Sequence, residues 1–157
     1  MKKKWIFLGI IAALGALQLT FLEYFKIFHV KPDLLLIAVV IATLKFDFRD
    51  ALIFSVFAGF FKDCFVAGTL GLNTLLFPLW CYLIFIITHQ FTIEEELFQV
   101  ALVPIVVILH NTVTGFIIVS QGAAVTFGIF LRITIVEAVV TTLVSPLIFR
   151  ITKPAFY

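Results

Sequence analysis

A chain of 157 residues with 63% hydrophobic and 13% charged residues, and a mean hydropathy of +1.22, is too apolar for a water-soluble domain. The charges gather in short clusters between long apolar runs, which is typical of a polytopic helical membrane protein rather than of a transmembrane barrel. The net charge of +2 is too small and too scattered to indicate nucleic acid binding.

Six apolar runs are predicted to be transmembrane helices, so the fold class is all-α, a polytopic membrane protein with a single integral-membrane domain. The predicted spans are residues 5–22, 31–45, 51–69, 72–89, 97–119 and 125–149. The second span is short, so Lys45 has to snorkel or the helix has to start earlier, near Phe28. The first run continues past a weak signal-peptidase-like triplet at Ala13, which favours an uncleaved first helix.

The distribution of basic residues predicts the orientation. Six crossings place both termini on one side of the membrane, and that side carries most of the basic residues: Lys2, Lys3, Lys4, Lys45, Arg49, Arg150 and Lys153. The other side keeps only Lys26 and Lys31 in its loops. The positive-inside rule therefore predicts that both termini are cytoplasmic.

Turn-forming and small residues are predicted to start and pack the helices. Pro32 suits the first turn of a helix, and Asp33 there complements the positive end of the helix dipole. The residues expected to allow close packing or tight turns are Ala12, Ala16, Gly59, Gly68 and Gly71.

Among the ionisable residues within predicted spans, four stand out: Lys62, Asp63, Arg132 and Glu137. Such groups cost a few kcal/mol each to insert, so each is a candidate functional residue. Asp63 and Arg132 each lie about 9 Å inside the outer boundary, which makes them candidate partners. A structural ion pair between their two helices is favoured over a transport role. Lys62 is expected to snorkel outward.

A second polar group is predicted between the last two helices. Glu137 shares a helix face with Thr134, Thr141 and Ser145, and a polar patch with His110 and Asn111 lies at similar depth on the preceding helix. The two patches can therefore meet, and Glu137 is expected to be neutral or to bond His110 or Asn111. A polar clasp between the helices is the favoured interpretation, and a proton relay or small-ligand site is the alternative.

No catalytic or cofactor motif is found. The chain has no His-Glu-x-x-His, no Gly-x-Ser-x-Gly and no P-loop, so no catalytic residue is predicted and the protein is not expected to be an enzyme. The three histidines are scattered, so no metal site or cofactor is expected either. Cys64 and Cys81 lie in apolar segments and are interpreted as buried free thiols.

The stretch from Lys31 to Tyr82 resembles the rod shape-determining MreD family. It contains Pro-Asp followed by a Leu/Ile run, then Gly-Phe-x-x-Asp at residues 59–63, and then Leu-Gly-Leu-Asn-Thr-Leu at residues 70–75. The resemblance implies an inner-membrane component of the bacterial elongation machinery (elongasome) with a fold like that of the S-component of energy-coupling-factor transporters.

The resemblance also implies partners. Members of that family bind the single-pass periplasmic protein MreC, and the complex links cytoplasmic MreB filaments to RodA and a class B penicillin-binding transpeptidase for peptidoglycan synthesis. The interpretation is a non-catalytic scaffold in the lipid bilayer. The alternative is a vitamin-binding S-component, and the sparse polar groups in the predicted outer loops favour the scaffold.

Overall fold

The protein is a bundle of helices, seen in a computed structural model that describes residues 2–20, 30, 32–65, 71–90, 96–122 and 126–152. These ranges contain six helices: α1 (Lys2–Thr20), α2 (Leu34–Lys45), α3 (Phe48–Phe65), α4 (Leu72–Gln90), α5 (Glu96–Ser120) and α6 (Phe127–Thr152). The all-helical architecture predicted from the apolar runs is confirmed for these residues.

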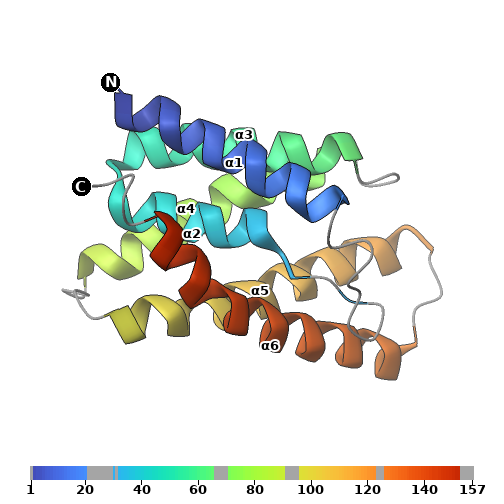
Figure 1. The fold of residues 1–157 in the computed structure, drawn as a ribbon. Coiled ribbons are helices and arrows are strands. Elements are labelled where there is room, and N and C mark those ends of the chain that lie inside the picture. Colours follow the sequence, from blue (N-terminus) through green and yellow to red (C-terminus); the bar gives the residue numbers. More distant parts are fainter. Residues whose placement is uncertain are drawn as a thin grey trace.

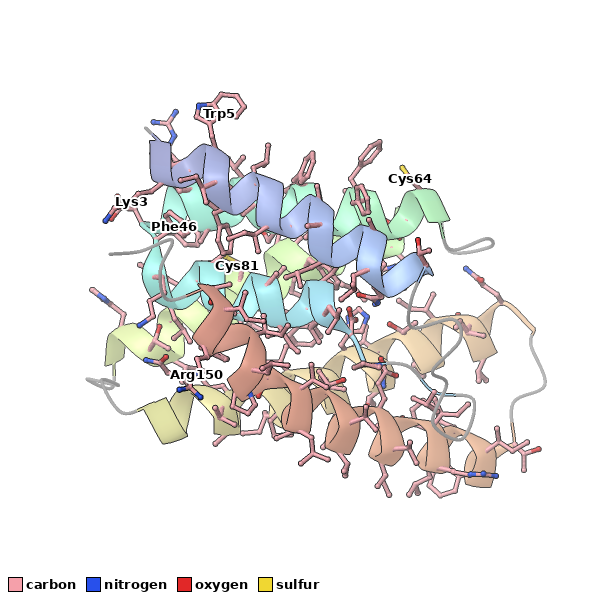
Figure 2. All side chains as sticks on the ribbon, in the orientation of Figure 1. Lys3, Trp5, Phe46, Cys64, Cys81 and Arg150 are labelled. Atoms are coloured by element: carbon pink, nitrogen blue, oxygen red, sulfur yellow. The ribbon has the colours of Figure 1, made fainter. Side chains whose placement is uncertain are left out.

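Successive helices run in alternating directions through the bundle, as Figure 1 shows. The N-terminal end of α1 and the C-terminal end of α6 lie at the same end, where Figure 2 labels Lys3 and Arg150. Lys4, Lys45 and Arg49 belong to helix ends on this side, so we call it the basic end. Cys64 lies toward the other end, which we call the opposite end, where α6 begins.

Among the described residues, three helices are long and apolar enough to cross a membrane. They are Leu72–His89 in α4, Phe98–Ser120 in α5 and Phe127–Thr152 in α6. α2 has only 12 residues, a length of about 18 Å, whereas the hydrocarbon core is about 30 Å thick. The six crossings expected from the sequence therefore stay a prediction.

Helix α2 forms the centre of the bundle. Every residue from Leu34 to Thr43 is buried, because α1, α3, α4, α5 and α6 all pack against this helix. A helix that is apolar on all sides is stable only in such a position. α2 begins at Leu34 with Asp33 as its N-cap, so the expected helix start is confirmed for Asp33, whereas Pro32 lies just outside the helix.

Helix α1 packs on the bundle through a different face from the small-residue face that was predicted. Phe7 and Ile11 are fully buried, and Gly15 lies against the ring of Phe61 on α3. These three residues recur every four positions, which places them on one side of the helix. Ala16 is exposed and Ala12 is only partly buried, so the expected small-residue face is not the one that packs inside the bundle.

Helices α3 and α4 form a tight hairpin through Gly59. A Cβ atom at this position would lie 2.4 Å from the backbone oxygen of Asn73 and 2.8 Å from the Cα of Thr74. Only glycine allows the two backbones to come this close, so the packing role predicted for Gly59 is confirmed. Gly71, at the start of the returning helix, has a φ of +88°, which glycine adopts without strain. Gly68 lies outside the described residues.

Asp63 fastens the same hairpin. Its carboxylate accepts hydrogen bonds from the backbone N–H of Asn73 and Thr74 and from both of their side chains, at 2.6–3.1 Å. The first turn of a helix has unpaired N–H groups and a positive dipole end, so a carboxylate from α3 stabilises the start of α4.

The pairing of Asp63 with Arg132 that equal depth suggested is therefore wrong. The carboxylate is turned toward α4, and α3 packs against α1, α2 and α4, whereas α6 packs against α2 and α5. Arg132 is exposed on the first turns of α6. Depth along a helix does not determine the direction in which a side chain points.

The close approach of α3 and α4 at Gly59 is tested by comparing Gly59→Ala with Gly9→Ala. Gly59→Ala is expected to destabilise the protein by about 1–3 kcal/mol, because the added methyl meets backbone atoms that cannot move independently. Gly9→Ala, on α1, has nothing within 4 Å and should be neutral or stabilising by about 0.5–1 kcal/mol. Unfolding of the purified variants in detergent would measure both. Equal effects would contradict the close approach.

Candidate functional site

A buried ion pair lies at the start of the central helix. The Nζ of Lys62 on α3 is 2.5 Å from Oδ2 of Asp33, the N-cap residue of α2. The Asp33 side chain is 1% exposed and that of Lys62 is 17% exposed, so both charges are largely removed from solvent. Such a pair is stable only when both partners are present, since either charge alone is costly to bury. Lys62 is therefore turned into the bundle, and its predicted outward snorkelling is wrong.

The other polar atoms of Asp33 are hydrogen-bonded within α2 and to two further helices, α1 and α6. Its Oδ1 accepts from the backbone N–H of Leu36 at 3.2 Å and from Nε2 of Gln18 on α1 at 3.4 Å. Gln18 Oε1 in turn accepts from the backbone N–H of Leu35. The backbone N–H of Asp33 donates to the hydroxyl of Thr141 on α6 at 3.2 Å. One capping residue thus joins α1, α2, α3 and α6.

Aromatic residues of α4 and a histidine of α5 enclose the other side of the pair. The ammonium of Lys62 lies 5.2 Å from the ring centroid of Phe77, within the range of a cation–π contact. Phe77 also packs on His110, with ring centroids 5.5 Å apart. The indole N–H of Trp80 donates to Nδ1 of His110 at 3.2 Å. Because an indole N–H only donates, Nδ1 is an acceptor and this imidazole is neutral.

The predicted clasp between α5 and α6 is present in part. Nδ2 of Asn111 donates to Oε2 of Glu137 at 2.8 Å, which confirms one of the two expected partners. His110, the other expected partner, bonds Trp80 instead. Glu137 also lies close enough to interact electrostatically with Asp33 and Lys62. The clasp and the ion pair therefore belong to one polar cluster in the middle of the bundle.

The cluster differs from the predicted site in two respects. Asp33 was expected only to start a helix, and Gln18 and Thr141 were not identified as its partners. The signal that could have identified Asp33 is that a carboxylate at a helix start within apolar sequence needs a cation, and Lys62 is a cation in the interior of the next predicted span. Gln18 is likewise the one amide in an otherwise apolar run from Leu8 to Leu19.

The arrangement is suited to holding helices together. Protein groups surround the ion pair: Gln18 and the backbone N–H of Leu36 donate to Asp33, and the Phe77 ring lies beside the Lys62 ammonium. Among the described residues, no group of three His, Cys, Asp or Glu side chains is placed to hold a metal ion. Cys81 is buried and Cys64 is exposed, so the expectation of two buried thiols is confirmed for Cys81 only.

The ion pair is tested by single and double substitutions. Asp33→Asn keeps a good N-cap but removes the charge, and Lys62→Met keeps the apolar stem. Each is expected to cost about 3–5 kcal/mol, because one charge is left buried without its partner, while the double variant should cost much less. The free energy of unfolding in detergent would measure the three variants.

The control is the ion pair between Lys4 and Asp50 at the basic end, which is also short at 2.6 Å, but Lys4 there is 52% exposed. Lys4→Met and Asp50→Asn should each change stability by at most about 1 kcal/mol. Additive losses in the Asp33/Lys62 double variant would show that this pair does not act as a unit.

Comparison with known proteins agrees with the resemblance seen in the sequence. The family model described as rod shape-determining protein MreD matches residues 2–154. No curated protein and no solved structure gives a match. The matched range covers nearly the whole chain and includes every residue of the polar cluster. The chain therefore belongs to the MreD family of rod shape-determining proteins.

Proposed function

We propose that this protein is a non-catalytic scaffold of the bacterial cell-elongation complex that binds an MreC-like single-pass membrane protein and supports lateral peptidoglycan synthesis. The observation that carries the proposal is the family match over residues 2–154, since the family determines rod shape. Through the MreC-like partner, the scaffold is linked to MreB filaments, RodA and a class B penicillin-binding transpeptidase.

The packing of the helices supports a scaffold. Asp33, Lys62 and Glu137 are bonded to other residues of the same chain, so their polar groups hold the bundle together. The outward faces of α5 and α6 are apolar and include exposed Ile105, Phe116 and Leu143. A surface of this kind fits a protein that stays in the bilayer and contacts other helices by shape.

The proposed location is the bacterial inner membrane, with both termini in the cytoplasm. Lys3, Lys4, Lys45, Arg49 and Arg150 at the basic end support this orientation through the positive-inside rule. Trp5 is 72% exposed at the same end, where an indole ring is suited to the membrane interface.

The vitamin-binding alternative has weaker support. Within the part of the chain that the structure describes, one groove of about 400 Å³ lies between α5 and α6, and another of about 260 Å³ lies between α1 and α3. The first is lined by apolar side chains and one threonine, Thr142, whose hydroxyl donates to its own helix backbone. A vitamin with several polar groups needs more donors and acceptors than this groove offers. The predicted outer loop from Glu23 to Lys31, where an S-component would hold its ligand, lies outside the described residues except for Val30.

A co-purification experiment tests the partner. The tagged full-length chain, extracted in mild detergent, should retain an MreC-like single-pass protein, and depletion of the chain should turn rod-shaped cells into spheres. An unrelated polytopic protein of the same membranes, tagged in the same way, is the control and should retain none. Tight vitamin binding by the isolated chain without that partner would support the transporter alternative instead.

Single cysteines test the orientation. In a Cys64→Ser, Cys81→Ser background, Gln121→Cys in the turn after α5 should react with a membrane-impermeant maleimide added to intact spheroplasts. Lys3→Cys and Arg150→Cys should react only after permeabilisation, because both lie at the basic end. Labelling of Arg150→Cys in intact spheroplasts would exclude a cytoplasmic C-terminal end of α6.

A further inference from the structure

Two threonine hydroxyls between α5 and α6 have no hydrogen-bond partner within the part of the chain that the structure describes. They are the Oγ1 atoms of Thr114 and Thr134, both buried, and Thr134 as a whole is 7% exposed. Thr112 and Thr142 on the same two helices instead donate to the carbonyl one turn earlier. Buried polar groups in proteins are nearly always bonded, either by protein or by ordered water. The two hydroxyls therefore indicate a place where water is held.

This place adjoins the partly buried carboxylate of Glu137. Asn111 on α5 bonds Glu137 on α6 at 2.8 Å, and the two helices run in opposite directions. Thr114 lies three residues further along α5, and Thr134 lies three residues back along α6. Residues three apart share a helix face, so both hydroxyls lie one turn from the bonded pair, on the side of the opposite end.

The ring of Phe130, one turn before Thr134 on α6, packs against α5 at Gly115. A Cβ atom at Gly115 would lie 2.3 Å from a ring carbon of Phe130, so the ring rests directly on the glycine of α5. This contact closes the α5–α6 interface between the two threonines and the opposite end. Thr141 lies one turn from Glu137 on the side of the basic end. Its hydroxyl already accepts a hydrogen bond from the backbone N–H of Asp33.

The charges around Glu137 favour a site that binds a proton. The groups that act on it are Asp33 at the start of α2 and Lys62 of α3, which form the ion pair. His110 of α5 is neutral because it accepts from Trp80, and the charge of Asp63 is stabilised by its hydrogen bonds to the first turn of α4. With Glu137 ionised, Asp33, Lys62 and Glu137 sum to −1 + 1 − 1 = −1, and a proton brings the sum to zero. A buried net charge is costly, so the protonated cluster is stabilised.

We propose that Glu137, Asn111, Thr114 and Thr134 form a hydrated proton-binding site between α5 and α6 that Phe130 closes toward the opposite end. The ligand is a proton carried by water: hydronium gives its proton to the Glu137 carboxylate and leaves as water, with no other reactant. The site does not depend on which partner the protein binds.

Infrared difference spectroscopy of the full chain in lipid vesicles tests the site. A protonated carboxyl gives a carbonyl band that shifts in heavy water, and a band that titrates in the native chain but is missing in Glu137→Gln is the expected result. In Thr114→Val/Thr134→Val, the band should persist to a pH higher by about one unit or more, because the carboxylate loses hydrogen-bonded water. In Phe130→Ala, the heavy-water shift should appear at least several-fold faster.

The matched control is Thr112→Val/Thr142→Val, which removes two hydroxyls that bond their own helices and should leave the titration unchanged. Thermal unfolding gives a second readout. Valine at 114 and 134 should lower the melting temperature if the hydroxyls hold water, and should raise it if they are dry, because a dry unpaired hydroxyl is itself costly. A Glu137 band that never titrates, or a raised melting temperature of the 114/134 variant, would overturn the proposal.

Discussion

The ion pair between Asp33 and Lys62 is the interaction on which the arrangement of the bundle depends. Asp33 starts the central helix, and its polar atoms are bonded by Gln18 of α1, Lys62 of α3 and Thr141 of α6. In a low-dielectric interior, neither charge can leave the other without a large cost. Because α2 is only 12 residues long, its first residue lies deep in the bundle, so the charge pair is placed where the other helices meet.

The neighbouring residues Lys62 and Asp63 together determine how α3 is rotated. Side chains one residue apart on a helix point about 100° apart. Lys62 is directed toward α2, and Asp63 is directed toward the first turn of α4. Any rotation of α3 that improves one of these contacts breaks the other. Gly59, one turn earlier, then brings the backbones of α3 and α4 together, so the hairpin has a single arrangement.

Sequence patterns predicted the properties that depend on local composition. Hydropathy located the helices to within a few residues, Asp33 was recognised as a helix start, and polar spacing led to the bond between Asn111 and Glu137. The partners of Asp63 could not be predicted, because depth gives a position along the helix axis but not a direction around it. The packing face of α1 was missed for a related reason: Gly15 is required by the ring of Phe61, which is distant in sequence.

The same internal bonding limits how a partner could recognise the protein within the bilayer. Asp33, Lys62, Asp63 and Glu137 direct their polar groups to other helices of the chain, whereas the exposed faces of α5 and α6 are apolar. Lipid tails are as apolar as leucine, so hydrophobicity alone does not favour a partner helix over lipid. Recognition in the membrane would then rest on shape along grooves such as that between α5 and α6, and charged contacts would be made at the basic end, where Arg150 is exposed.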